Sequence, residues 1–167
     1  MHRLIRAVAA LVLLAACAHQ PPPKAAVTFR KQSAQIYSSA VLEPARLVGH
    51  WQQVATFAEG GQAGCAPGTV DIAATGQARW SLCLAGRAVS GSGPFVMARP
   101  GRFAVRGMAD WWVMWADADY RTLVIGTPSG QFGFVLNRGA TLPADRLKAA
   151  TDIARFNGYA IDKFVVF

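Results

Sequence analysis

The side chains that could act as catalytic acids, bases or metal ligands are few and far apart in this sequence. The chain has three histidines, and only His50 lies in a patterned segment, where strand alternation turns it away from the interior. Asp117 and Asp119 form a carboxylate pair, but their place beside a strand turn favours turn and capping roles. No nucleophile–base set, phosphate loop or metal-spaced cluster can be assembled from these residues. We therefore expect a protein that is not an enzyme and has neither a metal site nor a cofactor.

The first residues of the chain indicate export. Arg3 and Arg6 precede the small and apolar run 7–16, which is typical of a secretory signal and too short to span a bilayer permanently. The run ends in the letters LAAC, which resemble the lipobox of bacterial lipoproteins. The resemblance implies cleavage just before Cys17, anchoring by acyl chains on this cysteine and, because Ala18 is not Asp, sorting to the periplasmic face of the outer membrane. The alternative is an ordinary Ala-x-Ala signal followed by an incidental cysteine.

The two remaining cysteines are expected to form a disulfide. Past the signal the compartment is oxidising, and Cys65 and Cys83 make an even count. In the chain-entropy model this bridge stabilises the fold by roughly 3 kcal/mol. Zinc is a poor alternative because no histidine lies near either cysteine.

The sequence is basic, with 17 Lys and Arg against 9 Asp and Glu and a formal charge of +8. Loss of Arg3 and Arg6 with the signal lowers this charge to +6. An exported lipoprotein meets no nucleic acid, so nucleic acid is excluded as a partner. The charge favours anionic lipid headgroups or acidic ligands, or it is simply a solvated basic surface.

From Val48 onward, short alternating apolar runs are separated by Gly, Pro and Asn, which is typical of an all-β barrel or sandwich. The links are short, as in Thr75-Gly76-Gln77, and short links favour antiparallel neighbours in an up-and-down meander. Gly91 and Gly93 predict a bend or bulge in the fourth run. The predicted strands are 51–57, 69–75, 78–84, 87–97, 102–106, 111–116, 121–127 and 131–137.

A helix and a ninth strand are predicted after these eight. Pro143 stands near the first turn of the helix, and an apolar stripe runs from Leu147 to Ala154 at three- and four-residue spacing. Asn157-Gly158 is expected to end the helix. The stretch 159–167 alternates weakly between apolar and polar residues and ends in FVVF.

We therefore expect an all-β fold: an eight-stranded antiparallel up-and-down β-barrel with a C-terminal α-helix and a short ninth strand. The chain divides into a signal peptide at 1–16, a lipidated cysteine with a flexible tether at 17–40, and a barrel domain at 41–167. The tether prediction rests on the proline run 21–23 and the lack of pattern around it.

This order of elements resembles a lipocalin, and three local motifs carry the resemblance. Gly49-His50-Trp51 opens the first strand like the family's Gly-x-Trp. The DADY stretch 117–120 resembles its Thr-Asp-Tyr loop, although not in frame, and Arg138 ends the eighth strand where the family keeps an arginine. The tail from Thr141 to Phe167 is similar to that of bacterial outer-membrane lipocalins and, more distantly, of the apolipoprotein D branch.

The resemblance implies a plug at one end of the barrel. Trp51 would seal that end, and Arg138 would stack on the indole with a cation–π energy of about 0.5–2 kcal/mol while bonding carbonyl oxygens of the incoming chain. The predicted barrel-closing motif is Gly49, Trp51, Asp117, Tyr120 and Arg138. In the same topology, the Cys65–Cys83 bridge would pin the rim of the open end, with Cys83 pointing outward.

The stretch DWWVMWADADY at 110–120 holds three of the five tryptophans. Alternation places Trp111 and Trp115 on one face and Trp112 on the other, and the resemblance turns the first face toward the barrel interior. A membrane belt would need the rings displayed together, so alternation argues against one.

An interior rich in aromatic residues and nearly free of charge can be filled by its own side chains or can hold one small ligand. We favour an apolar cavity over a filled barrel. The predicted cavity residues are Gln53, Ala55, Phe57, Phe103, Val105, Trp111, Val113, Trp115, Val124, Phe132, Phe134 and Leu136.

The function predicted from these features is binding of a small hydrophobic molecule, such as a fatty acid, lysophospholipid or isoprenoid, for transport, storage or scavenging at the bacterial envelope. The main alternative is a structural or interaction lipoprotein with a filled barrel and no ligand. A weaker alternative is an isomerase-like enzyme on the same barrel, for which no residue marks a site.

Overall fold

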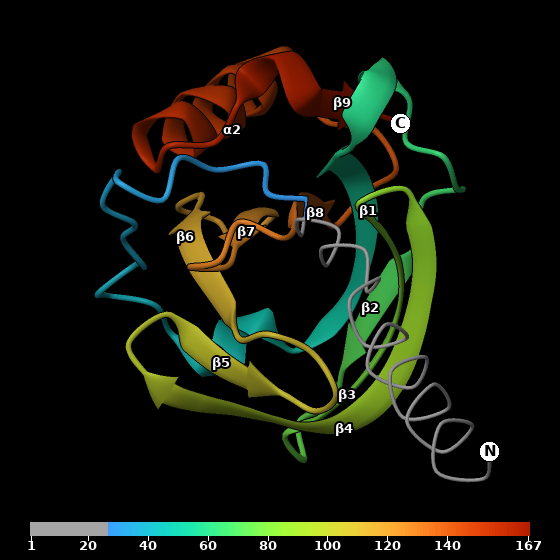
Figure 1. Cartoon of the computed structure of the whole chain (residues 1–167). Helices are drawn as coiled ribbons and strands as arrows, with labels where there is room; N and C mark the ends of the chain where they lie inside the picture. The colour runs from blue at the N-terminus through green and yellow to red at the C-terminus, as the bar shows by residue number, and fades with distance from the viewer. Residues whose placement is uncertain (1–26) are drawn as a thin grey trace, which may run out of the picture.

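The computed structural model describes residues 27–167, so Cys17 and the predicted signal peptide lie outside the described residues. The eight predicted strands all form in chain order (Figure 1). Short turns or loops join them, except that residues 58–68, with the 3₁₀ helix η3 (Glu59–Gly61), link β1 to β2. The strands are β1 (Gly49–Phe57), β2 (Thr69–Ile72), β3 (Gln77–Leu84), β4 (Arg87–Arg99), β5 (Arg102–Val105), β6 (Trp111–Ala116), β7 (Thr122–Gly126) and β8 (Gly133–Asn137).

The strands form one closed antiparallel barrel. Each strand pairs with the next along the chain, and β1 closes the sheet by pairing with both β8 and β2. A ninth strand, β9 (Phe164–Val166), adds to the end of β1. The predicted fold, an eight-stranded up-and-down barrel with a helix and a short ninth strand, is confirmed.

The helix α2 (Ala144–Phe156) lies against the outside of the barrel wall (Figure 1). Ala150 and Ala154, which belong to the predicted stripe, are buried in an apolar layer with outward-facing residues of the strands, such as Val135. Phe156, at the end of the helix, is 69% exposed and stacks on Tyr37. Among the described residues, no helix has the length and apolar character needed to cross a membrane.

The two ends of the barrel differ in what covers them. The connections that follow β1, β3, β5 and β7 gather at one end, which we call the mouth end; the connections that follow β2, β4 and β6 lie at the other, the closed end. Residues 38–48 cross the closed end and include the short 3₁₀ helix η2 (Pro44–Leu47). Their contacts there include Ser38 Oγ donating to the carbonyl of Pro100 at 2.9 Å and the backbone N–H of Ser39 donating to Val113 at 2.8 Å.

The predicted tether boundary at residue 41 is wrong for its last part, because the chain is packed into the fold from residue 28 onward. Phe29 is 1% exposed, and its N–H donates to the carbonyl of Gly130 in the β7–β8 loop. The buried guanidinium of Arg30 donates to the carbonyl oxygens of Asn157, Pro128 and Ala34. Composition alone favours an unstructured linker here, whereas Gly130, Pro128 and Asn157 lie about a hundred residues or more away and leave no local pattern.

This packing predicts that Phe29→Ala lowers the free energy of unfolding by about 3–5 kcal/mol, the usual cost of emptying a buried phenylalanine site. Urea unfolding followed by tryptophan fluorescence measures the change. Val27→Ala is the matched control, since Val27 is 49% exposed and its truncation should change stability by less than about 0.5 kcal/mol. Equal stability of the two variants would show that this segment does not belong to the folded domain.

Candidate functional site

The closed end is sealed by Trp51 and Arg138. Trp51 is fully buried, its indole N–H donates to the carbonyl of Leu47 at 2.7 Å, and the Arg138 guanidinium carbon lies 3.7 Å from the centre of the ring. The predicted stacking of Arg138 on the indole is therefore what the structure shows. Burial lowers the pKa of Arg138, and the ring face and surrounding carbonyls supply the compensating negative potential.

Arg138 also ties the incoming chain to the barrel. Its Nη2 donates to the carbonyl oxygens of Arg46 and Val48 at 2.9 and 3.0 Å, and its Nη1 donates to that of His50 at 3.1 Å. Gly49 has φ +116°, and a Cβ placed on it would lie 2.8 Å from Nη1 of Arg138. Glycine is therefore required here both by the backbone conformation and by the space that the guanidinium occupies.

The DADY loop completes the closed end. The carboxylate of Asp117 accepts from the backbone N–H groups of Arg121 and Thr122, which is the turn-capping role expected of it. The hydroxyl of Tyr120 accepts from the N–H of Glu43 at 2.8 Å, and Arg46 covers the ring at 4.1 Å. Tyr120 has φ 54°, so the tyrosine itself adopts a left-handed backbone conformation in this loop.

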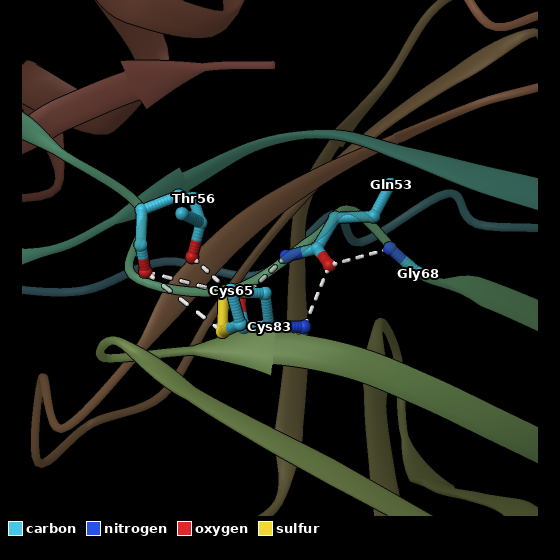
Figure 2. Close-up of a disulfide and its surroundings, with 6 residues drawn as sticks. Gln53, Thr56, Cys65, Gly68 and Cys83 are labelled. Atoms are coloured by element: carbon cyan, nitrogen blue, oxygen red, sulfur yellow. Dashed lines mark hydrogen bonds between the residues drawn. A yellow bond between two sulfur atoms is a disulfide. The ribbon is translucent and has the colours of Figure 1, made fainter.

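The predicted disulfide between Cys65 and Cys83 is present, at the mouth end of the barrel (Figure 2). Cys83 lies on the strand face opposite Leu82 and Leu84, which face the interior, so it points outward as predicted. The Gln53 side chain bonds both the N–H and the carbonyl of Cys83, at 2.8 and 2.7 Å. Because β2 begins only at Thr69, this amide supplies the hydrogen bonds that a neighbouring strand would otherwise give to the end of β3.

Seven of the twelve predicted cavity residues belong to the barrel interior. They are Phe103, Val105, Trp111, Val113, Phe132, Phe134 and Leu136. Gln53 is buried, but its amide is held in the wall beside Cys83. The other four, Ala55, Phe57, Trp115 and Val124, belong to the apolar layer that includes α2. For those four the predicted interior position is wrong.

Two β-bulges account for three of these errors. The register of β1 against β8 shifts between Gln53 and Ala55, so the residues after the bulge change face and Ala55 and Phe57 point outward. The register of β6 against β7 shifts between Val113 and Trp115, so Trp115 points outward. A bulge adds one residue to a strand and reverses its alternation. Neither bulge lies at a glycine, so strand alternation alone does not reveal it.

The fourth error, Val124, arises because β7 is buried on both faces. Leu123 and Ile125 face the interior and Val124 faces the outer layer. An apolar run without polar positions does not reveal which set points inward.

The interior next to the closed end is filled by aromatic rings. Phe95 and Phe103 stack at 4.2 Å between centroids, and Trp111 packs edge-on against Phe95 at 5.8 Å and Phe134 at 5.1 Å. Trp80 continues the cluster, at 6.0 Å from Trp111. Rings at these distances contribute packing energy beyond their buried area, so this part of the barrel is a core and not a cavity.

A cavity of about 530 Å³ lies at the mouth end, beside this ring cluster. It opens between the first half of β4, the β5–β6 loop and the end of the β7–β8 loop. Its apolar wall includes Trp80, Leu84, Val89, Met108 and Phe132. The volume lies within the range of small-molecule sites.

Tyr159 holds the β7–β8 loop, which forms part of this mouth. Its hydroxyl accepts from the N–H of Thr127 and donates to the carbonyl of Phe132, both at 2.8 Å. Burial raises the pKa of Tyr159 to about 12. The neutral hydroxyl can therefore donate and accept at the same time throughout the physiological range.

Among the predicted cavity residues, Phe132 is the one that lines the mouth cavity. The sequence prediction did not include Trp80, Leu84, Val89 or Met108. The alternation in ARWSLCL placed Trp80 and Leu84 on one apolar face, and that signal was sufficient to find them. Met108 follows a loop glycine and carries no strand pattern.

The cavity is lined by apolar and small side chains, two arginines and Gln131. In residues 27–167 no cluster of histidine, cysteine and carboxylate side chains is suited to holding a metal ion. His50 pairs with Asp71 at 2.7 Å on the outer surface, and neither residue lines the mouth cavity.

Comparison with known proteins supports the fold. The model of the lipocalin-like domain family matches residues 96–167. The siderocalin Ex-FABP, described as functioning through dual ligand specificities, is similar with a TM-score of 0.57 and 13% identity over 73% of this chain and 93% of that one. The cockroach allergen Per a 4 is similar with a TM-score of 0.54 and 11% identity over 80% of this chain and 93% of that one. None of the curated protein sequences matches this chain.

These likenesses show the lipocalin fold.

The closed end gives a direct prediction. Arg138→Ala should lower the free energy of unfolding by about 1–3 kcal/mol, because it removes the stacking on Trp51 and leaves carbonyl oxygens of residues 46–50 without their donor. Thermal or urea unfolding measures the loss. Lys148→Ala is the control, since this lysine makes an exposed ion pair with Asp152 worth less than about 1 kcal/mol. A loss at Arg138 no larger than that at Lys148 would contradict the role assigned to it.

Proposed function

We propose that this protein binds a small hydrophobic molecule at the mouth end of its barrel and carries or stores it at the bacterial envelope. The observation that supports this most strongly is the cavity of about 530 Å³ with an apolar wall, next to an interior that is otherwise filled. Each methylene of a ligand buried there contributes about 0.8 kcal/mol. Fatty acids, lysophospholipids and isoprenoids fit this chemistry.

The packed aromatic rings of the barrel interior limit how deep a ligand can enter. The six rings of Trp80, Phe95, Phe103, Trp111, Phe132 and Phe134 form one continuous cluster. A ligand in the observed cavity contacts the edge of this cluster through Trp80 and Phe132 and does not pass through it. The alternative of a protein with a filled barrel and no ligand describes the closed half well, and the cavity at the mouth favours binding.

The envelope location rests on the N-terminal sequence. The LAAC motif supports acylation of Cys17, and Ala18 supports sorting to the outer membrane with the barrel facing the periplasm. This arrangement would place the protein beside the lipids from which an acyl ligand comes. A bacterial outer-membrane lipoprotein of the lipocalin type is the identity we propose.

The first experiment is native mass spectrometry of the protein purified gently from its own host. An added mass that disappears on organic extraction would identify the ligand. An apo mass, with no tryptophan fluorescence response to palmitate or lysophospholipid, would instead support the filled-barrel alternative.

Filling the cavity should remove binding without unfolding the protein. Val89 lines the cavity, and Val89→Trp should weaken binding of the neutral probe N-phenyl-1-naphthylamine by about tenfold or more, because the indole occupies the ligand's space. Val96→Trp is the matched control on the same strand, where the side chain is 57% exposed on the outer face. A fluorescence titration measures both, and equal affinities would contradict the assignment of this cavity as the site.

Anchoring can be tested separately from binding. Cys17→Ala should move the protein from the outer-membrane fraction to the soluble periplasm and abolish labelling by an alkyne fatty acid, because the acylated sulfur is lost. His19→Ala keeps the cysteine and should leave both readouts unchanged. Membrane association and labelling that persist in Cys17→Ala would exclude this anchor.

A further inference from the structure

The mouth cavity carries charge of one sign, and we propose that it selects single-chain amphiphiles with an anionic head group, held between Arg87 and Arg106. This inference rests on the proposed function, since it assigns a ligand class to the same cavity. It adds that the head group is recognised by its charge and that the acyl chain lies against the apolar wall below.

The charged residues that line the cavity are both arginines. Arg87 begins β4, Arg106 directly follows β5, and no carboxylate joins them in the lining. Within residues 27–167, neither guanidinium forms an ion pair, whereas Arg46, Arg121 and Arg155 each pair with an acid. Two arginines without counter-charges at the rim of an apolar cavity fit a carboxylate or phosphate, which they can bond through charge-assisted hydrogen bonds.

The nearest acidic residue in the chain does not occupy this place. Asp110 lies four residues after Arg106 and does not line the mouth cavity, although Arg106 and Asp110 both line a second hollow on the outer surface with Val96 and Ala104. Within the described residues Arg106 and Asp110 form no ion pair, so the guanidinium is available to a ligand at the mouth.

A gap in the barrel wall gives the head group access to this site. β4 pairs with β3 from Arg87 to Pro94, and its pairing with β5 begins only at Phe95. In the described structure, the first half of β4 thus has no strand partner on its β5 side. The cavity lies along this open edge, between Ser90–Ser92 and the loop that begins at Arg106. A chain-shaped ligand can enter sideways here while its head group stays at the rim.

A hydrogen-bond donor in the cavity wall lacks a partner. Trp80 is 4% exposed, and its Nε1 is the one buried side-chain nitrogen or oxygen of residues 27–167 that makes no hydrogen bond. The indole packs against Gly91, where a Cβ would lie 2.6 Å from Cζ2 and 3.1 Å from Nε1. Both residues line the cavity. A buried unpaired N–H costs about 1–3 kcal/mol, and a ligand oxygen entering along the Gly91 edge would remove that cost.

The test compares ligands that share a twelve-carbon chain and differ in their head group. Dodecanoic acid, dodecyl phosphate and 1-dodecanol displace the neutral probe N-phenyl-1-naphthylamine from the secreted Cys17→Ala chain, which carries no acyl anchor. We expect the acid or the phosphate to bind about tenfold or more tightly than the alcohol, and the stronger of the two identifies the head group. The double variant Arg87→Gln/Arg106→Gln should lose this preference and keep its affinity for the probe and the alcohol.

Two further variants sharpen the result. Arg79→Gln removes an arginine on the outer face of β3 that does not line the cavity, and it should preserve the preference for anions. Trp80→Phe keeps an aromatic ring but removes the N–H, and it should weaken binding of the acid and the phosphate several-fold more than binding of the alcohol, whose neutral oxygen is the weaker acceptor.

The outcomes separate this inference from the proposed function. If the probe and all three amphiphiles fail to bind, the proposed function itself fails. If the probe binds but acid, phosphate and alcohol compete equally, or if the double arginine variant retains the anion preference, hydrophobic binding stands and the anionic subsite is excluded.

Discussion

The Arg138 guanidinium lying on the Trp51 indole is the contact that closes one end of the barrel. The guanidinium lies on the face of the ring, and its Nη1 and Nη2 donate to the backbone carbonyls of Arg46, Val48 and His50. One side chain from the last barrel strand therefore fixes the path by which the chain enters the first. Without it, the crossing segment would leave carbonyl groups without donors and the end of the aromatic core uncovered.

Closure at one end explains why the other end can remain hollow. The stability of the barrel comes from the ring cluster around Trp111 and from the outer apolar layer beneath α2. Additional restraints at the mouth are covalent or polar: the Cys65–Cys83 bridge, the Gln53 amide and the Tyr159 hydroxyl. These groups hold the rim without occupying the space inside it. The mouth can thus keep an apolar cavity that the packing of the core would otherwise have filled.

Much of this architecture could be predicted from the sequence, because alternation, turn residues and a helical stripe are local signals. The strand order, the disulfide and the stacked Trp51–Arg138 pair follow from such signals and from the resemblance to lipocalins. The placement of Ala55, Phe57 and Trp115 could not be predicted, because each follows a bulge that reverses the alternation and is set by pairing with a distant strand. The ordered position of Phe29 depends on contacts with residues near the C-terminus. The mouth cavity depends on where β4 stops pairing with β5. This is a property of strand register, and no residue type in the sequence indicates it.

The contacts of the N-terminal segment also determine the order in which the molecule can assemble. Arg30 bonds Asn157 across 127 residues of sequence, and β1 obtains its closing partners from β8 and β9 near the far end of the chain. Contacts of such long sequence separation form late, because a large loop must close before they contribute any stability. If a chain crosses a membrane from its N-terminus onward, its first strand and the segment before it reach the far side first. At that stage β8, β9 and Asn157, with which they pair, have not yet crossed. Its early segments must stay soluble through that interval, and the barrel closes only when the last fifth of the sequence has arrived.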